Sequence, residues 1–298
     1  MCGIVGLFLK DRTLEPELGR LLTGMLVTMS DRGPDSAGIA VYSEADGKDG
    51  KLTVQSDTPA EDFPTLARTL SDALDVDVDL VVNDTHAVID VPGDRLDAAR
   101  AFLNKACLGL RVMSAGQAVE IYKEVGLPQA VADRFGVPRM AGSHGIGHTR
   151  MATESAVTTD GAHPYNTGPD QCLVHNGSLS NHNALRRKLT REGIRIESEN
   201  DTEVGAAYLT WRMREGATLG EALESGIEDL DGFYTFVVGT RDGFGVLRDP
   251  IACKPAVLAE TDRYVAFGSE YRALVGLPDI EAAKIWEPEP ATVYFWSH

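Results

Sequence analysis

Runs and alternations of hydrophobic residues along the chain predict a mixture of strands and helices. An apolar run over residues 4–8 predicts a buried strand. Apolar residues three and four positions apart over 14–29 then predict an amphipathic helix, and a run over 37–42 predicts another strand. The remaining patterns outside 50–115 predict helices at 128–135, 183–192, 202–214, 220–230 and 270–274, and strands at 118–122, 171–175, 234–238, 243–247, 255–259, 264–268 and 292–296.

Residues 50–115 differ from the rest of the chain in the order of their predicted strands and helices. Their patterns predict, in order, a strand at 51–56, a helix at 62–74, strands at 76–82 and 86–91, a helix at 95–103 and a strand at 108–113. This βαββαβ order is that of the ferredoxin-like split unit. We therefore interpret the segment as an inserted subdomain, with an irregular α/β excursion as the alternative.

Charge and composition narrow the classes of partner. The chain has 28 Lys and Arg against 45 Asp and Glu, a formal net charge of −17, which argues against a nucleic acid or an anionic membrane as the partner. No apolar run approaches the roughly 18 residues that a membrane-spanning helix needs. The N-terminus lacks the basic flank and long apolar core of a signal peptide, so we expect a cytoplasmic protein.

Cysteine and histidine spacing offers little support for disulfides or metals. Cys2, Cys107, Cys172 and Cys253 are far apart and form no CxxC pair, and we expect the last three to be buried as small hydrophobic residues. Three histidines stand in a glycine-rich stretch without cysteine or carboxylate at ligand spacing: His144, His148 and His163. We therefore expect neither a metal site nor a cofactor.

Cys2 carries the first candidate chemistry. It follows Met1 and precedes the small residue Gly3, so removal of Met1 would leave a thiol and a free α-amine on one carbon. Because an α-amine titrates at about pH 8 and a thiol at about 8.5, the amine can take the proton that activates the sulfur. The alternative is a disordered start with an incidental cysteine.

The chain also contains the groups that such a thiolate would need. Asn176-Gly177 follows the predicted strand at 171–175 and offers a side-chain amide and a backbone N–H for an oxyanion hole, although Asn-Gly is also a common hairpin turn. Arg150 can bind a carboxylate through two hydrogen bonds, and Asp201 can bind an ammonium group, although lone residues of these types usually form structural salt bridges. The polar loop at 30–36, which contains Arg32, is either a simple turn or a wall of the site.

Seven segments with distinctive polar and glycine residues follow one another along nearly the whole chain outside 50–140. They are Met1-Cys2-Gly3-Ile4-Val5-Gly6, Arg32-Gly33-Pro34-Asp35-Ser36-Ala37-Gly38, Gly147-His148-Thr149-Arg150-Met151-Ala152-Thr153, His163-Pro164, His175-Asn176-Gly177, Asn200-Asp201-Thr202-Glu203, and Arg248-Asp249-Pro250 with Ser269-Glu270. In this order they resemble the motifs of the class II, or N-terminal nucleophile (Ntn), glutamine amidotransferase domain.

The resemblance implies an α+β fold: a four-layer αββα Ntn-hydrolase sandwich of two antiparallel sheets over residues 1–298, interrupted by the ferredoxin-like insert at 50–115. It implies hydrolysis of glutamine to glutamate and ammonia. The roles carried over by position are these: Cys2 as nucleophile with its α-amine as base, Asn176 and the Gly177 N–H as oxyanion hole, Arg150 with Thr153 as carboxylate clamp, Asp201 with Gly177 as ammonium partners, and Arg32 and His163 as supporting residues. Met151 departs from the family pattern, since many members have tryptophan there.

The resemblance also implies a partner. Family members usually carry a second domain that uses the ammonia. The matching motifs extend along the 298 residues of this sequence, so we expect the ammonia acceptor on another chain. The form of the motifs is closest to amidotransferase subunits of glutamate-synthase-like complexes such as N-methylglutamate synthase, which implies flavin-containing synthase partners in a hetero-oligomer. A glutaminase subunit of another such assembly and a non-catalytic glutamine-sensing module are the alternatives.

Overall fold

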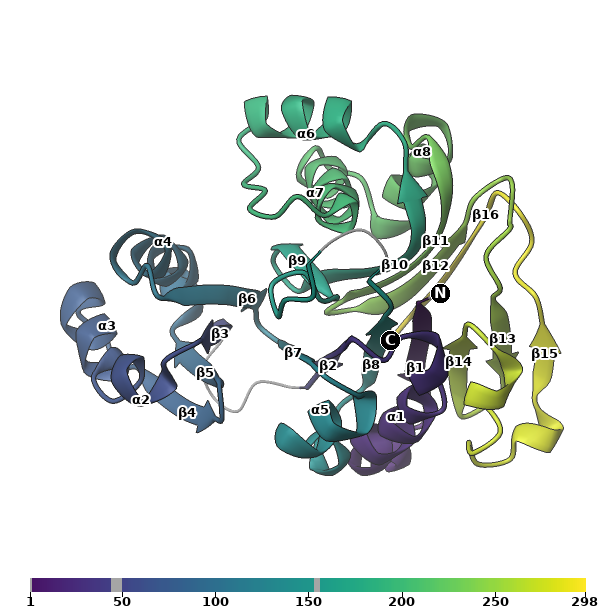
Figure 1. The fold of residues 1–298 in the computed structure, drawn as a ribbon, viewed down its shortest axis with the longest axis horizontal. Coiled ribbons are helices and arrows are strands. Elements are labelled where there is room, and N and C mark those ends of the chain that lie inside the picture. Colours follow the sequence, from purple (N-terminus) through teal and green to yellow (C-terminus); the bar gives the residue numbers. More distant parts are fainter. Residues whose placement is uncertain (1, 44–49, 153–155) are drawn as a thin grey trace.

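The computed structural model describes residues 2–43, 50–152 and 156–298 (Figure 1). A seven-stranded antiparallel sheet has the order β15-β13-β14-β1-β8-β2-β7. Its strands are β1 (Gly3–Leu9), β2 (Ser36–Tyr42), β7 (Val119–Val125), β8 (His144–Arg150), β13 (Val257–Glu260), β14 (Tyr264–Gly268) and β15 (Lys284–Trp286).

A five-stranded antiparallel sheet with the order β16-β12-β11-β10-β9 packs against the first one. Its strands are β9 (Tyr165–Gly168), β10 (Gln171–Leu179), β11 (Gly232–Thr240), β12 (Gly243–Arg248) and β16 (Thr292–Ser297). Alternation along β1 explains the packing: Ile4 and Phe8 join the cluster between the sheets, whereas Val5 and Leu7 face the helices on the outer side.

Helices cover both outer faces and complete four layers (Figure 1). On the larger sheet lie α1 (Leu18–Val27), preceded by a 3-10 turn at Arg12–Glu17, and α5 (Pro128–Arg134). On the smaller sheet lie α6 (His182–Arg191), α7 (Asp201–Arg214) and α8 (Leu219–Asp229). The expected α+β sandwich with two antiparallel sheets is confirmed.

Residues 50–116 lie to one side of the sandwich, at the left of Figure 1. The elements follow in the order β3 (Gly50–Ser56), α2 (Pro59–Asp62), α3 (Leu66–Leu74), β4 (Asp79–Asn83), β5 (His86–Val91), α4 (Leu96–Ala106) and β6 (Leu110–Gly116). The strands form an antiparallel sheet in the order β4-β5-β3-β6. The segment has a hydrophobic cluster of its own, which supports the proposal that it is an inserted subdomain.

The hydrophobic pattern predicts no strand over residues 144–150, yet β8 lies between β1 and β2 and is fully buried. Its glycines conceal the alternation of a strand, and the packing of α1 explains them. A Cβ at Gly145 would stand 2.7 Å from Leu22 Cδ2, and one at Gly147 would stand 2.9 Å from Leu26 Cδ1. The absence of side chains therefore lets α1 lie directly on the sheet.

Three local expectations need correction. Asn176-Gly177 does not form a turn, because β10 continues through it to Leu179 and stays paired with β11. Helix α7 begins at Asp201, one residue before the predicted start at 202, and the side chain of Asn200 caps it by accepting from Thr202 N. Of the three cysteines expected to be buried, only Cys172 is; Cys107 is partly buried, and Cys253 is exposed in the loop between β12 and β13.

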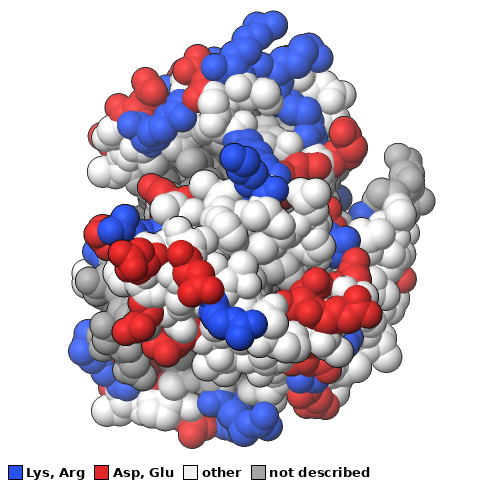
Figure 2. Space-filling view, turned by 90° about the vertical axis from the view of Figure 1, so that its left-hand side faces the viewer, with Lys and Arg blue, Asp and Glu red and all other residues white. Residues whose placement is uncertain are grey.

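The acidic excess is not uniform over the surface. Figure 2 shows acidic and basic side chains mixed on the face of the insert, with Lys and Arg gathered at the top, at the level of α6. This helix carries Arg186, Arg187, Lys188 and Arg191. Across the ranges that the structure describes, none of the helices is long and apolar enough to cross a membrane.

Candidate active site

Cys2 stands directly before β1, a central strand of the larger sheet. Reciprocal hydrogen bonds fix the start of this strand: Ile4 N donates to Ser269 Oγ at 2.9 Å, and Ser269 N donates to the Ile4 carbonyl at 2.9 Å. On the other side, Gly3 is paired with Thr149 of β8. The backbone at Cys2 is thereby held in place by strands on both sides, and the side chain stays partly exposed.

The Cys2 carbonyl accepts two hydrogen bonds from different parts of the chain. Asn176 Nδ2, from β10 of the smaller sheet, donates at 3.2 Å, and Arg32 Nε donates at 3.0 Å. Arg32 is itself buried and forms an ion pair with Glu270 at 2.6 Å. This pairing is the first cause of a lowered pKa at the Glu270 carboxyl. The loop at 30–36 therefore lies beside Cys2.

Gly177 follows Asn176 and has a conformation that requires glycine. Its φ is +147°, and a Cβ there would stand 2.0 Å from the Phe233 carbonyl oxygen on the neighbouring strand. Asn176 is buried, whereas Gly177 is exposed. The amide side chain and an accessible stretch of backbone thus lie next to each other close to Cys2.

Asp201 is tied to the same strand two residues further on. Its Oδ2 accepts from Leu179 N at 2.9 Å, and its Oδ1 lies 3.7 Å from His175 Nδ1. Burial raises the pKa of Asp201, but the His175 ring and the Leu179 N–H outweigh burial, so the pKa lies below its ordinary value. The carboxylate is therefore ionised at neutral pH.

A buried network of three histidines and Thr202 continues from Asp201 and includes the predicted supporting residue His163. Thr202 Oγ1 lies 3.1 Å from His175 Nδ1 and 3.1 Å from His163 Nε2, and the His163 ring stacks on His148 with centroids 4.1 Å apart. Burial lowers the pKa of His163 well below its usual range and that of His148 to about 3, so both rings are neutral. His163 thus contacts the first turn of α7.

Arg150 is the last residue of β8, where it pairs with Ser36 of β2. Its side chain is 8% exposed, and Nη1 donates to the Ala156 carbonyl at 3.3 Å. Asp35 holds the chain just beyond it, because Asp35 Oδ2 accepts from Ala152 N at 2.8 Å. Met151 is 36% exposed, and Thr153 lies outside the described residues.

The comparisons with known proteins agree on one family. A family model described as a glutamine amidotransferase domain matches residues 148–276. A protein of Rhizobium meliloti (strain 1021) named glutamine amidotransferase-like protein GlxB is 66% identical over 298 residues, which cover 100% of this chain and 99% of that protein. This chain belongs to the class II glutamine amidotransferase family.

More distant proteins extend the match. A putative glutamine amidotransferase of Methanothermobacter thermautotrophicus is 32% identical to this amidotransferase over 317 residues, covering 99% of each chain. The glutamine phosphoribosylpyrophosphate amidotransferase of B. subtilis superposes with a TM-score of 0.61 at 19% identity. That superposition covers 99% of this chain and 47% of the solved chain, so this chain spans about half of that structure and shares its Ntn fold.

In this amidotransferase the structure brings four of the residues predicted from the sequence together. Cys2, Asn176 and Arg32 are joined by direct hydrogen bonds, and Asp201 is attached to β10 beside them. His175 and Thr202 were not singled out, although each lies within a recognised motif, His175-Asn176-Gly177 and Asn200-Asp201-Thr202-Glu203. Among the residues with described positions, no three His, Cys, Asp or Glu side chains are arranged to hold a metal ion.

Proposed function

We propose that this amidotransferase hydrolyses the γ-amide of glutamine through the thiolate of Cys2, once Met1 has been removed, and passes the ammonia to a synthase partner. One observation carries the proposal. The carbonyl of Cys2 is held by Asn176 Nδ2 and Arg32 Nε, so the proposed nucleophile and the proposed oxyanion donor are attached to each other across the two sheets.

The chemistry follows from the groups around Cys2. The thiolate attacks the carbonyl carbon of the side-chain amide, the carbonyl electron pair moves onto oxygen, and the C–N bond breaks when that pair returns. An amide side chain has two N–H donors, so Asn176 can hold the Cys2 carbonyl with one and the oxyanion with the other, next to the Gly177 N–H. The α-amine, having taken the thiol proton, gives it to the departing ammonia. Water then attacks the thioester and releases glutamate and the thiol.

The two ends of the substrate require opposite charges. Arg150, with Thr153, is proposed to bind the α-carboxylate of glutamine, since a guanidinium matches a carboxylate with two parallel hydrogen bonds. Asp201, with Gly177, is proposed to bind the α-ammonium group. The lowered pKa of Asp201 supports this role, because only the ionised carboxylate attracts a cation. Fixing both ends converts a weak encounter into a reactive geometry.

The acceptor of the ammonia is proposed to lie on another chain. The match to the Rhizobium meliloti protein extends from end to end, which supports an amidotransferase of the same organisation. We propose a cytoplasmic hetero-oligomer of the N-methylglutamate synthase type, with flavin-containing synthase subunits that resemble those of glutamate synthase. A glutaminase subunit of another glutamate-synthase-like assembly and a glutamine sensor without turnover are the outcomes that the tests below distinguish.

Ammonia release from glutamine tests the chemistry. Protein whose intact mass shows that Met1 is absent is expected to release ammonia, alone or with its partners, and Cys2→Ala is expected to abolish release while glutamine still binds. Cys253→Ala removes an exposed cysteine and is the matched control with unchanged activity. Binding without release by the mature protein and its partners would favour a sensor, and full activity of Cys2→Ala would exclude the nucleophile.

Co-purification tests the partner. The chain is expected to be recovered with synthase subunits that carry a flavin, detected by its absorbance, and ammonia release is expected to increase in that complex. A chain that stays monomeric in extracts containing its natural partners would contradict the complex.

A further inference from the structure

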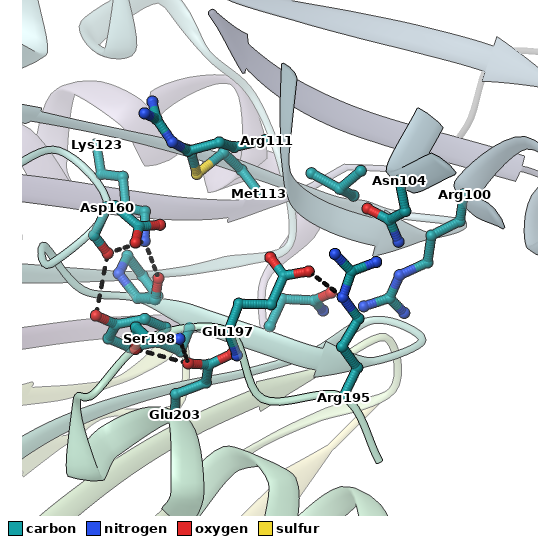
Figure 3. Close-up of a pocket in the computed structure, with 14 residues that line it drawn as sticks. Arg100, Asn104, Arg111, Met113, Lys123, Asp160, Arg195, Glu197, Ser198 and Glu203 are labelled. Atoms are coloured by element: carbon teal, nitrogen blue, oxygen red, sulfur yellow. Dashed lines mark hydrogen bonds and ion pairs between the residues drawn. The ribbon is translucent and has the colours of Figure 1, made fainter. Parts of the chain in front are cut away.

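Lys123 on β7 is a buried cation that the proposed mechanism does not use. Its side chain is 3% exposed, and Nζ donates to three backbone carbonyl oxygens: that of Ala162 at 2.8 Å, of Asp160 at 3.2 Å and of Pro164 at 3.5 Å. Nζ also lies 4.4 Å from the centre of the Tyr165 ring. Figure 3 shows this ammonium group directed at the segment that begins with Asp160, on one wall of a cavity of about 50 Å³.

The segment that Lys123 holds, residues 160–164, contacts both ends of the proposed glutamine site. A Cβ added at Gly161 would stand 3.3 Å from Arg150 Nη1, so the backbone there packs against the proposed carboxylate binder. At the other end of the segment, His163 Nε2 lies 3.1 Å from Thr202 Oγ1, in the first turn of α7, where Asp201 begins the helix.

We propose that Lys123 is a positioning residue for glutamine: its ammonium group holds segment 160–164 against Arg150 and Thr202 and thereby sets the affinity of the site for the substrate. The inference rests on the proposed function, because it takes Arg150 and Asp201 as the residues that bind glutamine.

The number and kind of the contacts make the role specific to a cation. An ammonium group has three N–H donors, and each of the three carbonyl groups takes one. Hydrogen bonds from a charged donor are stronger than neutral ones, and a carbonyl that loses its donor inside the protein pays the cost of desolvation. An apolar residue at 123 would therefore leave the segment with unpaired carbonyls, whereas arginine would keep the charge and several donors.

The ammonium group also titrates within an accessible range of pH. Burial lowers the pKa of Lys123 to about 8, with opposing contributions from Asp160 and Glu203 and a further lowering by Arg111. Above this pH the folded protein loses the charge, so the hold on segment 160–164 weakens as pH rises. The titratable and charged groups around Lys123 are Asp160, His163, Tyr165, Glu203, Arg111 and His86.

Calorimetric binding of glutamine to the full chain with Cys2→Ala separates affinity from turnover. We expect Lys123→Met to raise the Kd about tenfold or more, the scale of one lost charge-assisted hydrogen bond, and Lys123→Arg to restore most of the affinity. Between pH 7 and 9 the Kd should rise more with Lys123 than with Lys123→Arg. The α-amines of the protein and of glutamine titrate equally in both, so they cancel.

A matched control is available in Lys51, which is also buried but pairs with Glu120 away from the site. Lys51→Met is expected to leave the Kd for glutamine unchanged in the same Cys2→Ala background. If Lys123→Met and Lys51→Met have the same Kd for glutamine, the inference is overturned. If Lys123→Met does not fold, the pH series decides instead. The inference is then overturned if the Kd changes with pH equally in the protein with Lys123 and in Lys123→Arg. Arg150→Gln is measured alongside. If it weakens binding while Lys123→Met does not, only the inference on Lys123 fails; if the unmodified site does not bind glutamine, the proposed function and the inference both fail.

Discussion

At Cys2, side chains from distant parts of the chain meet on one peptide carbonyl. Arg32 lies 30 positions away in sequence and Asn176 lies 174 positions away, and both donate to the same oxygen. Neither contact concerns the thiol itself, so they fix the backbone that carries the sulfur. The main chain of the proposed site is therefore preorganised, which suits the proposed role of Cys2 as a nucleophile with its own α-amine as base.

Gly177→Ala is expected to lower the free energy of unfolding by about 2–4 kcal/mol and to abolish ammonia release. The added Cβ would stand 2.0 Å from the Phe233 carbonyl oxygen at a φ of +147°, so β10 must shift beside Asn176. Gly220→Ala is the control, because nothing lies within 4 Å of a Cβ at that helical position. We expect it to be neutral or stabilising by about 0.5–1 kcal/mol. Chemical denaturation of both variants checks the difference, and equal stabilities would contradict it.

The sequence allowed the candidate site residues to be named but did not predict their surroundings. Residue type and position within a motif pointed to Cys2, Asn176 and Asp201. Local pattern could not separate a hairpin turn from a continuing strand at Asn176-Gly177, because the answer depends on pairing with β11, more than 50 residues later. Thr202 was not recognised as part of the site for the same reason, since its contacts with His163 and His175 form only in the folded protein.

Among the elements, β8 and α7 place most of the proposed substrate site. β8 ends at Arg150, and α7 begins with Asp201, so each charge stands at the end of a rigid element. The sequence predicted α7 to within one residue, at 202–214 against Asp201–Arg214, but it gave no strand for 144–150. In that strand glycines occupy positions where α1 leaves no room for side chains, which removes the alternation that identifies strands.

Removal of the cap of α7 tests whether this helix start holds the ammonium end of the site. Asn200→Ala is expected to lower the free energy of unfolding by about 1 kcal/mol and also to raise the KM for glutamine, because Asp201 is the next residue. The control is Thr218→Ala, which removes the N-cap of α8, where Thr218 forms a capping box with Glu221. This variant should lose a similar free energy of unfolding without a change in the KM. Equal KM values in the two variants would contradict the role of the α7 terminus.

At the scale of the whole molecule, the fold buries several histidines in neutral form, two on β8 of the larger sheet and one on β5 of the insert. His86, His144 and His148 all have a pKa lowered to about 3, with burial as the first cause. The four-layer arrangement of the sandwich followed from the resemblance to a family. It could not follow from local pattern, since β1 pairs with β14 across more than 250 residues and no short-range signal encodes that partner.

Acid should therefore destabilise the fold before most carboxylates titrate. An unfolded histidine takes up a proton below about pH 6.5, whereas these buried rings do not until about pH 3, so the unfolded state binds more protons in this window. The free energy of unfolding is expected to fall below pH 6.5 by about 1 kcal/mol per histidine and pH unit. His144 lies at the end of β8 opposite to Arg150, and its ring is bonded to the Thr240 carbonyl. His144→Gln should reduce this slope by the share of one histidine, about 1 kcal/mol per pH unit. Denaturant titrations from pH 7 to 5 check the slope, and a flat profile would contradict it.

The most direct test of the central claim is to trap the nucleophile. A chloroketone analogue of glutamine reacts with a thiolate by forming a carbon–sulfur bond and releasing chloride, and peptide mapping by mass spectrometry locates the bond. We predict one adduct, on Cys2 of a peptide that lacks Met1, which excess glutamine prevents and which Cys2→Ala abolishes. Exposed Cys253 is the internal control for unspecific alkylation. Labelling of Cys253 with Cys2 left unmodified would contradict the account.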